Sequence, residues 1–288
     1  MSVIKEKVKT TFNDGSSLTV NLEYYEDAHS MLEDLKKRKR TSNSFYDMET
    51  KRLEEDWDGV RKYEDALKLL DNGFEDVVGE IKASTNRYYQ RRDQQTKRYK
   101  TFNDVQGFQP IVPLVLIGVP NNMINSYMTP IKTKVIDIYY DMTCSCGTST
   151  EQITKNGIEL LKCVLGLEKQ GYKINLFVCN SYSDKGKADM VCVKVKDSNR
   201  PLDIKRLSYP VCHTSYFRVL GFDWYSKFPL GTYRSGYGYA LGYHYSAEKL
   251  GIMAKNLFSK NAVYIMATEI IAKDEEHIKE ILMNRLAA

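Results

Sequence analysis

The chain has 288 residues, a formal net charge of +5, a hydrophobic fraction of 42% and a charged fraction of 27%. These values are ordinary for a soluble globular protein. No run of about 18 apolar residues is present, so we expect no transmembrane helix. The N-terminal sequence MSVIKEKVKTTF lacks the apolar core of a secretory signal, so we expect no secretion by a signal peptide and no contact with a membrane.

The first 50 residues are expected to form a β-hairpin and a helix. Apolar residues alternate with polar ones within 3–25, on both sides of the turn sequence NDGS. Residues 26–39 carry an apolar face, with acids early and bases late, which favours a helix. The basic block 36–40 at its end is interpreted as a solvated helix terminus, with a phosphate contact as the alternative.

Residues 51–105 are expected to form a helical region, with a short helix at 63–70 and a longer one from about 74 to about 100. The second half of the longer helix has almost no aliphatic face. Instead it interleaves bases with aromatic rings: Arg87, Tyr88, Arg91, Arg92, Lys97 and Arg98. This mixture can bind single-stranded nucleic acid, because rings stack on bases and cations contact phosphates. The alternative is an exposed helix that packs on a neighbouring subunit.

Residues 106–288 are expected to form an α/β domain. Several prolines between 102 and 130 exclude a long helix there. They flank the apolar patch 114–117, which we interpret as a short buried strand or a segment pressed against the core.

The centre of this domain is a predicted strand–helix–strand unit. The apolar runs 134–140 and 173–180 predict two strands, and 150–170 has the apolar stripe of a helix between them. This order is typical of two neighbouring parallel strands with a helix crossing over them. Further elements are expected at 189–196 (strand), 201–220 (helix broken at Pro210), 247–258 (helix), 262–268 (strand) and 274–286 (helix). The fold class predicted from this alternation is α/β, with a mostly parallel sheet and helices on both faces.

A candidate metal site follows the first strand of this unit. Asp141, Thr143 and Ser145 form the pattern D-x-[ST]-x-S between a buried strand and a helix. Oxygen ligands at alternate positions of a loop can converge on a hard cation, and Mg²⁺ would accept such a site with water completing its shell. The alternative is a strand-end loop in which Asp141 caps the helix or accepts backbone hydrogen bonds.

At this pattern the chain resembles the von Willebrand factor A domain, a family with D-x-S-x-S at the end of its first strand. The resemblance implies the topology of that family and a degenerate form of its metal-ion-dependent adhesion site. In the family, a threonine and an aspartate from later loops complete the metal site. Here Thr214, Ser215 and Asp223 are stand-ins for them, although none lies in a matching pattern.

Three further segments are similar to a family of bacteriophage proteins that has no agreed activity. They are WDGVRKYEDALKLLDNGF at 57–74, GVPNNMINSY at 118–127 and LDIKRLSYPVCHTSYFRVLGF at 202–222. This resemblance implies a phage origin. Because no secretory signal and no transmembrane helix are expected, the place expected for the protein is the host cytoplasm or the virion. It brings no functional residues with it.

The glycine- and tyrosine-rich stretch 231–245 is predicted to be an interaction loop. Its exposed side chains are expected to be Tyr233, Tyr237, Tyr239 and Tyr243. Tyrosine suits interfaces because its large ring carries a hydrogen-bonding tip. No credible catalytic set is present, so we expect a non-enzymatic protein that works through protein–protein contacts. It would be a homo-oligomer, a virion or assembly component, or a factor that engages a host protein. Nucleic-acid binding and a metal-dependent enzyme centred on Asp141 are the alternatives.

Overall fold

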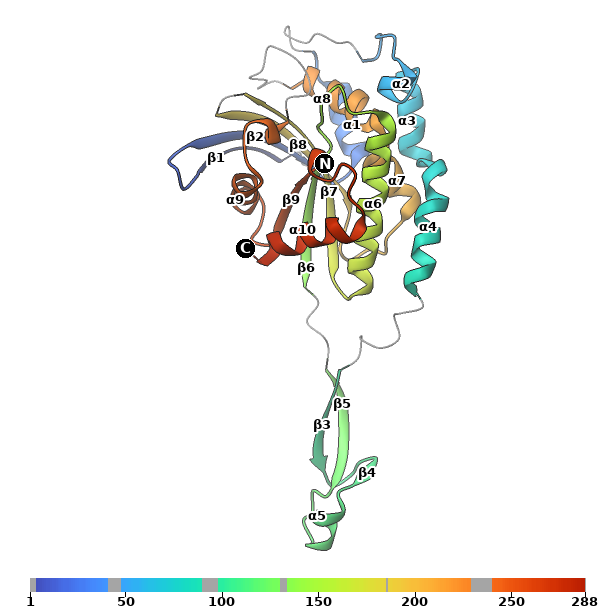
Figure 1. Cartoon of the computed structure of the whole chain (residues 1–288), viewed down its shortest axis with the longest axis vertical. Helices are drawn as coiled ribbons and strands as arrows, with labels where there is room; N and C mark the ends of the chain where they lie inside the picture. Colours follow the sequence, from blue (N-terminus) through green and yellow to red (C-terminus); the bar gives the residue numbers. More distant parts are fainter. Residues whose placement is uncertain are drawn as a thin grey trace.

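The computed structural model describes residues 4–40, 48–89, 98–129, 134–184, 186–228 and 240–287 (Figure 1). Its strands are β1 (Ile4–Thr11), β2 (Ser17–Tyr25), β3 (Arg98–Asp104), β4 (Gln109–Pro110), β5 (Met123–Thr129), β6 (Val135–Asp141), β7 (Lys173–Asp184), β8 (Lys187–Lys196) and β9 (Ala262–Met266). Its α-helices are α1 (Ala28–Lys37), α2 (Glu55–Asp58), α3 (Tyr63–Asn72), α4 (Glu75–Tyr89), α5 (Val112–Leu116), α6 (Thr150–Lys169), α7 (Ile204–Cys212), α8 (Phe222–Ser226), α9 (Ala247–Leu257) and α10 (Glu275–Ala287). A π-helix, η2 (Tyr216–Gly221), and two 3₁₀ turns, η3 (Leu241–Tyr243) and η4 (Ala267–Glu269), complete the list.

A six-stranded sheet in the order β1-β2-β8-β7-β6-β9 forms the centre of the body. The pairs β2–β8, β7–β6 and β6–β9 are parallel, whereas β1–β2 and β8–β7 are antiparallel. The predicted strand–helix–strand unit is confirmed, because β6 lies beside β7 in parallel register from Val135↔Lys173 to Asp141↔Cys179. The α/β class with a mostly parallel sheet is therefore correct.

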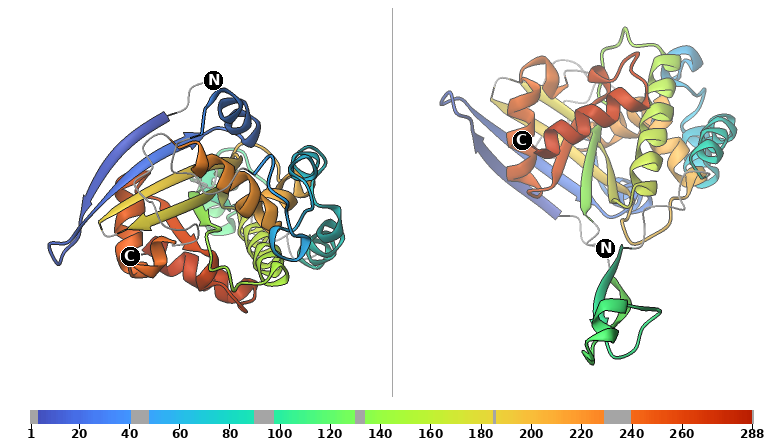
Figure 2. Two further views of the ribbon diagram at one scale, coloured as in Figure 1. Left: turned by 90° about the horizontal axis from the view of Figure 1, so that it is seen from above. Right: turned by 60° about the horizontal axis from the view of Figure 1, so that its bottom comes forward.

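Helices cover both faces of this sheet, also as predicted (Figures 1 and 2). Ile136, Ile138 and Tyr140 of β6 point into a core shared with α1, α4, α6 and α7. Tyr139, the residue between them, points to the opposite face, into a second core closed by α9. This alternation follows from the period of two along a strand. The central side chains of both cores are fully buried.

The crossover helix α6 begins where its sequence says it should. Ser149 accepts a hydrogen bond from the amide of Gln152, and the Gln152 side chain accepts one from the amide of Ser149. This capping box satisfies two amides that the first turn leaves without partners. Gly157 then allows α6 to approach α7, because a Cβ there would lie 2.4 Å from the carbonyl oxygen of Val211.

The N-terminal hairpin belongs to the same sheet as the rest of the body. Its second strand, β2, pairs in parallel with β8 from Thr19↔Lys187 to Tyr25↔Val193. The helices α3 and α4 pack on α6 and α7. The division expected at 50/51 therefore does not separate two packing units.

Residues 98–129 form a separate arm that projects from one end of the body (Figures 1 and 2). The arm is a three-stranded antiparallel sheet in the order β3-β5-β4, with α5 between β4 and β5. The division expected at 105/106 falls inside this arm. No buried residue occurs among 100–127.

Three expectations about local structure were wrong. The helix expected to reach about residue 100 ends at Tyr89, and β3 begins at Arg98, because Tyr99, Thr101 and Phe102 favour a strand that pairs with β5. The patch 114–117 is neither a strand nor buried: it lies on and just after the short helix α5, which has a proline in its first turn. The expected break at Pro210 comes later, because α7 continues through the proline to Cys212.

Candidate functional site

The loop after β6, where the sequence predicted a metal site, begins with a fully buried carboxylate. Asp141 accepts a hydrogen bond from the amide of Thr143 at 3.0 Å through Oδ1. Its Oδ2 accepts hydrogen bonds from the hydroxyls of Ser181 and Tyr264. These donors come from β7 and β9, the two strands that flank β6. Both carboxylate oxygens are therefore engaged by the protein itself.

Thr143 extends this buried network. Its hydroxyl accepts a hydrogen bond from the amide of Ser181 at 2.8 Å, and the Ser181 hydroxyl in turn accepts one from the amide of Leu241 at 3.3 Å. Burial raises the pKa of Asp141 above its ordinary value of 3.8, while the hydrogen bonds from Ser181, Tyr264 and Thr143 act in the opposite direction. The network joins three strand ends and the segment that begins at residue 240.

The third predicted ligand, Ser145, does not join this network. Its hydroxyl accepts a hydrogen bond from the amide of Gly147 at 3.1 Å. The structure thus brings Asp141 and Thr143 together and directs Ser145 into its own turn. The second reading of the sequence, in which Asp141 accepts a backbone hydrogen bond, describes the observed contact with Thr143.

A buried arginine that sequence reasoning missed holds the rest of this loop. The guanidinium of Arg218 donates to the carbonyl oxygens of Trp57 at 2.6 Å and Thr148 at 2.7 Å, and more weakly to Ser145 at 3.4 Å. It also lies 4.4 Å from the ring centroid of Trp57. Burial lowers the pKa of Arg218 from its ordinary value. The signal was an isolated base in the apolar run YFRVLG, where a charged side chain must find partners.

Arg218 reaches this position from the π-helix η2. Gly221, at the end of η2, permits close packing there, since a Cβ would lie 2.3 Å from Nδ2 of Asn180 on β7. π-helical turns are rare and occur often at functional sites. Here the turn fixes a cation inside the loop that was expected to hold a metal.

Two of the three stand-ins for later metal ligands have other partners, whereas the buried hydroxyl of Thr214 makes no hydrogen bond within the described part of the chain. Ser215 contacts Nδ1 of His213 at 2.9 Å and the hydroxyl of Tyr209 at 3.1 Å. Asp223 accepts hydrogen bonds from Tyr63 at 3.0 Å and from Lys227 at 3.1 Å. Across the described ranges, no group of three or more His, Cys, Asp or Glu residues could hold a metal ion. Binding of Mg²⁺ at Asp141 stays a prediction.

The predicted nucleic-acid residues fall on different parts of the chain. Arg87 and Tyr88 belong to α4, and Arg98 begins β3. Arg91, Arg92 and Lys97 lie outside the described residues. The single helix that was to present all six does not exist, and nucleic-acid binding stays a prediction without that scaffold.

The predicted tyrosine loop is described only at its end. Tyr233, Tyr237 and Tyr239 lie outside the described residues, whereas Tyr243 closes η3 with half of its surface exposed. Its role as an interaction residue is a prediction that the geometry leaves open.

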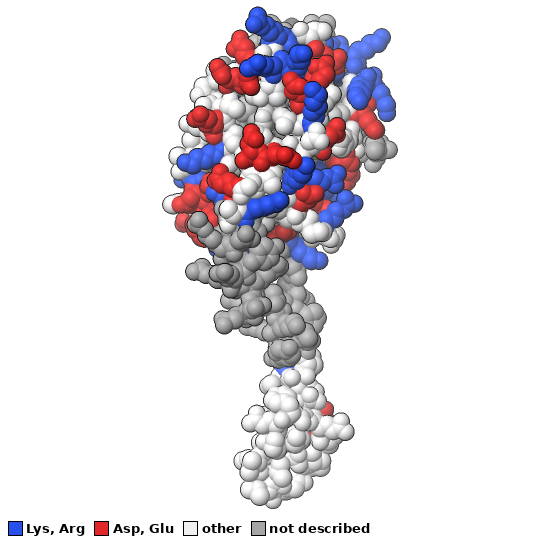
Figure 3. All heavy atoms as spheres, turned by 90° about the vertical axis from the view of Figure 1, so that its right-hand side faces the viewer, with Lys and Arg blue, Asp and Glu red and all other residues white. Residues whose placement is uncertain are grey.

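The arm presents a second candidate site, which includes the patch 114–117 that was expected to be a short buried strand or a segment pressed against the core. Eight of the nine large hydrophobic residues that are exposed in the described part of the chain belong to it: Phe102, Val105, Phe108, Val112, Val115, Leu116, Ile117 and Tyr127. Leu116 is 81% exposed and Ile117 is 73% exposed. Residues 105–129 contain no Asp, Glu, Lys or Arg, and Figure 3 shows this part of the surface almost free of charged side chains. An apolar patch of this kind marks an interaction surface.

Sequence comparison adds a family but no activity. A family model described as "Domain of unknown function (DUF7192)" matches residues 5–285. No curated protein and no solved structure matches the chain. Within the described residues, no helix has the length and apolarity needed to cross a membrane.

Proposed function

The chain belongs to the DUF7192 family, and from its geometry we propose that it is a non-enzymatic assembly protein whose arm packs against the arm of a second copy. The observation that supports this most is the arm's lack of a core. A three-stranded sheet needs a hydrophobic face packed on something to be stable. Residues 100–127 include no buried residue, so the arm obtains little of that packing within one chain.

The second copy is favoured as the partner because its arm offers an apolar surface of the same kind. On the described body, Tyr243 is the only large hydrophobic residue that is exposed. The body therefore offers the arm no comparable apolar surface. Two arms can bury their apolar sides against each other, and like charges would not meet where the contact is made by 105–129, because that stretch carries no charged residue.

The finer fold assignment is also part of this proposal. A von Willebrand factor A-like topology is supported by β6, α6 and β7 in that order, with Asp141 and Thr143 at the end of the first of these strands. In that family the equivalent loop serves adhesion. A phage origin, and a place in the virion or the host cytoplasm, follow from the sequence resemblance stated above and are proposed on that ground.

Self-association is tested by measuring molar mass by light scattering over a range of concentrations. The key variant replaces Phe108, Leu116 and Ile117 by Ser, and the control replaces the exposed Gln106, Gln109 and Asn121 of the same arm by Ser. The wild type and the control should form dimers or larger species. The apolar variant should dissociate at concentrations roughly 30-fold higher, because it loses about 2 kcal/mol of interface burial.

Two results would overturn the proposal. One is a wild type that stays monomeric at every concentration, and the other is an apolar variant that associates as the wild type does. A monomeric wild type that cosediments with phospholipid vesicles would assign the arm to a lipid surface instead. Circular dichroism of the variants should be unchanged, since the substituted side chains lie outside the cores of the body.

A further inference from the structure

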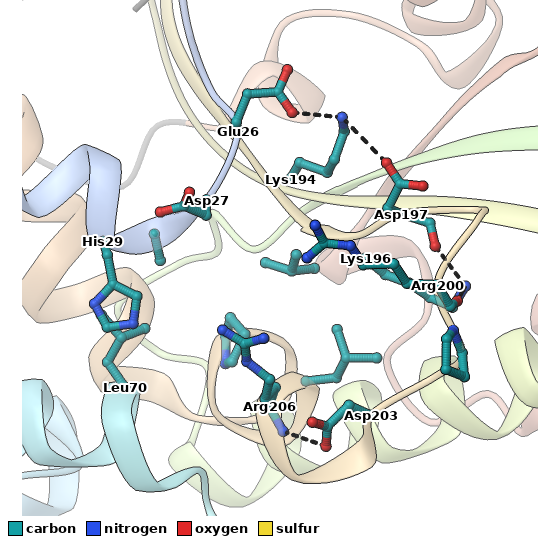
Figure 4. Close-up of a pocket in the computed structure, with 15 residues that line it drawn as sticks. Glu26, Asp27, His29, Leu70, Lys194, Lys196, Asp197, Arg200, Asp203 and Arg206 are labelled. Atoms are coloured by element: carbon teal, nitrogen blue, oxygen red, sulfur yellow. Dashed lines mark hydrogen bonds and ion pairs between the residues drawn. The ribbon is translucent and has the colours of Figure 1, made fainter. Parts of the chain in front are cut away.

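A cavity of about 490 Å³ lies at one end of the strands of the sheet, and Asp141 lies at the other end. Because β7 is antiparallel to β8, the carboxyl end of β8 lies beside the amino end of β7. The parallel strands β2 and β8 end there together, and the residues that follow them line the cavity (Figure 4). The carboxyl ends of parallel strands are where ligands bind in open α/β sheets. The volume lies within the range of small-molecule sites.

Two arginines whose guanidinium groups have no partner among the described residues point into this cavity. Arg200 follows β8 and Arg206 lies in the first turn of α7, and Figure 4 shows both side chains directed inward. Neither guanidinium makes a hydrogen bond or ion pair with a residue in the described ranges. Two guanidinium forks facing one cavity suit an anionic group with several oxygens, such as phosphate.

The other cations of the lining are already neutralised. Lys194 lies 2.6 Å from a carboxylate oxygen of Glu26. Lys196 is buried and lies 2.5 Å from Glu168, and it also donates to the carbonyl oxygen of Ile174 at 3.1 Å. Because acids neutralise both lysines, the unpaired positive charge among the described lining residues is that of Arg200 and Arg206.

Two aspartates of the lining retain acceptor capacity. Asp27 caps α1 by accepting from the amide of Ser30 at 2.7 Å, and Asp203 caps α7 by accepting from the amide of Arg206 at 3.2 Å. Each uses Oδ1 for this bond. Their second oxygens can accept hydrogen bonds from the hydroxyls of a ligand. The remaining wall is apolar and includes Leu207.

We propose that this cavity binds a small phosphorylated molecule that carries hydroxyl groups, of the nucleotide or sugar phosphate class. Arg200 and Arg206 hold the phosphate, and Asp27 and Asp203 accept hydrogen bonds from hydroxyls. A nucleic-acid strand fits less well, because the carboxylates that suit hydroxyls would repel its successive phosphates. No residue of the arm lines this cavity, so the test of ligand binding is independent of the test of self-association.

The test is calorimetric titration of the full chain with adenosine 5′-monophosphate, glucose 6-phosphate, inorganic phosphate, adenosine and a single-stranded oligonucleotide. At least one phosphate ester should bind, and the double variant Arg200→Ala with Arg206→Ala should weaken it by about 10-fold or more. The control, Arg61→Ala with Lys82→Ala, changes the net charge equally at exposed positions outside the lining and should leave affinity unchanged. Asp203→Asn should weaken binding while keeping the helix cap, because Asn is also a good N-cap residue.

Several outcomes would overturn the proposal. Absence of binding by both esters at millimolar concentration would exclude the class. Equal loss in the control would show that only net charge matters. Inorganic phosphate that binds as tightly as the esters would reduce the cavity to a simple anion site, and tighter binding of the oligonucleotide would assign it to nucleic acid.

Discussion

The body and the arm use their sequences in opposite ways. In the body, the strands β6, β7, β8 and β9 bury side chains on both faces of the sheet, and the buried charges of Asp223 and Lys227 pair at 3.0 Å. In the arm, residues 100–127 bury no side chain, and 105–129 include no charged one. The body specifies its fold by internal contacts, whereas the arm's side chains specify a surface. The following experiments measure how far this difference extends.

The largest effect is expected from one substitution made in both regions. Leu161 of α6 is fully buried, and Leu116 at the end of α5 is 81% exposed. Leu161→Ala should lower the free energy of unfolding by about 2–5 kcal/mol, because it removes transfer energy and leaves a cavity. Leu116→Ala should change it by no more than about 0.5 kcal/mol at concentrations where the protein is monomeric. Urea unfolding followed by circular dichroism measures both.

The concentration dependence of this pair sharpens the comparison. If the arm is buried by a second copy, Leu116→Ala should become destabilising when the protein is concentrated, because association stabilises the folded state. Leu161→Ala should lower the free energy of unfolding by the same amount at every concentration. If both variants lost the same free energy of unfolding in dilute solution, the arm would be packed within one chain. That result would contradict the difference proposed between body and arm.

A smaller effect is expected where the body uses a charge as a structural part. Arg218→Lys keeps the charge but loses the planar fork that reaches three carbonyl oxygens. We expect a loss of about 2–3 kcal/mol, since buried carbonyl groups would lack donors. Arg61→Lys, at a side chain that is 77% exposed, is the matched control and should change stability by no more than about 0.5 kcal/mol.

A stable Arg218→Lys protein would contradict the role given to Arg218. It would mean that the loop after β6 is held by the Asp141 network alone. Hydrogen exchange of the amides in 143–149 distinguishes the two cases, because loss of the anchor should speed exchange there and leave exchange in β6 unchanged.

The core of the body could be predicted because local patterns and tertiary packing agree there. The apolar run 134–140 and the stripe within 150–170 match β6 and α6 closely, since a strand and a helix that bury a face must repeat with its period. The position of Asp141 at the end of the strand could be predicted from the same run. Its partners Ser181 and Tyr264 could not be predicted, because no local pattern indicates which strands will flank β6.

The arm could not be predicted for the opposite reason. A sequence pattern reports which residues are apolar but not whether the chain buries them, and the patch 114–117 was assigned to the core on that basis. The run of bases and tyrosines before it suggested one helix through residue 100. The pairing of β3 with β5 overrides this preference for a helix. It places Arg98 opposite Thr129, and a pattern within a short window cannot predict a contact between residues so far apart in the sequence. The lack of charge in 105–129 was the available signal.

The smallest effect is expected at Asp141, where the body satisfies a polar group internally. Asp141→Asn keeps the shape but places an amide donor against the hydroxyls of Ser181 and Tyr264. We expect it to be about 1 kcal/mol less stable than the wild type at pH 4. Burial raises the pKa of Asp141 in the folded protein. The Asp141 carboxyl of the folded wild type therefore stays protonated to a higher pH than it does in the unfolded chain. The stability that protonation gives is complete below pH 3.8 and is lost as pH rises through the folded pKa.

The difference between the two proteins should therefore narrow as pH rises from 4 to 8, since the variant has no carboxyl to ionise. Urea unfolding at several pH values measures it, with the exposed Asp71→Asn as the control for net charge. A difference that instead widens with pH in Mg²⁺, but not in EDTA, would show that a cation stabilises the ionised carboxylate. That result would establish the metal site predicted from D-x-[ST]-x-S, and it would mean that the network opens to admit the ion. The same narrowing with and without Mg²⁺ would leave Asp141 as a structural residue whose two carboxylate oxygens are satisfied by Thr143, Ser181 and Tyr264.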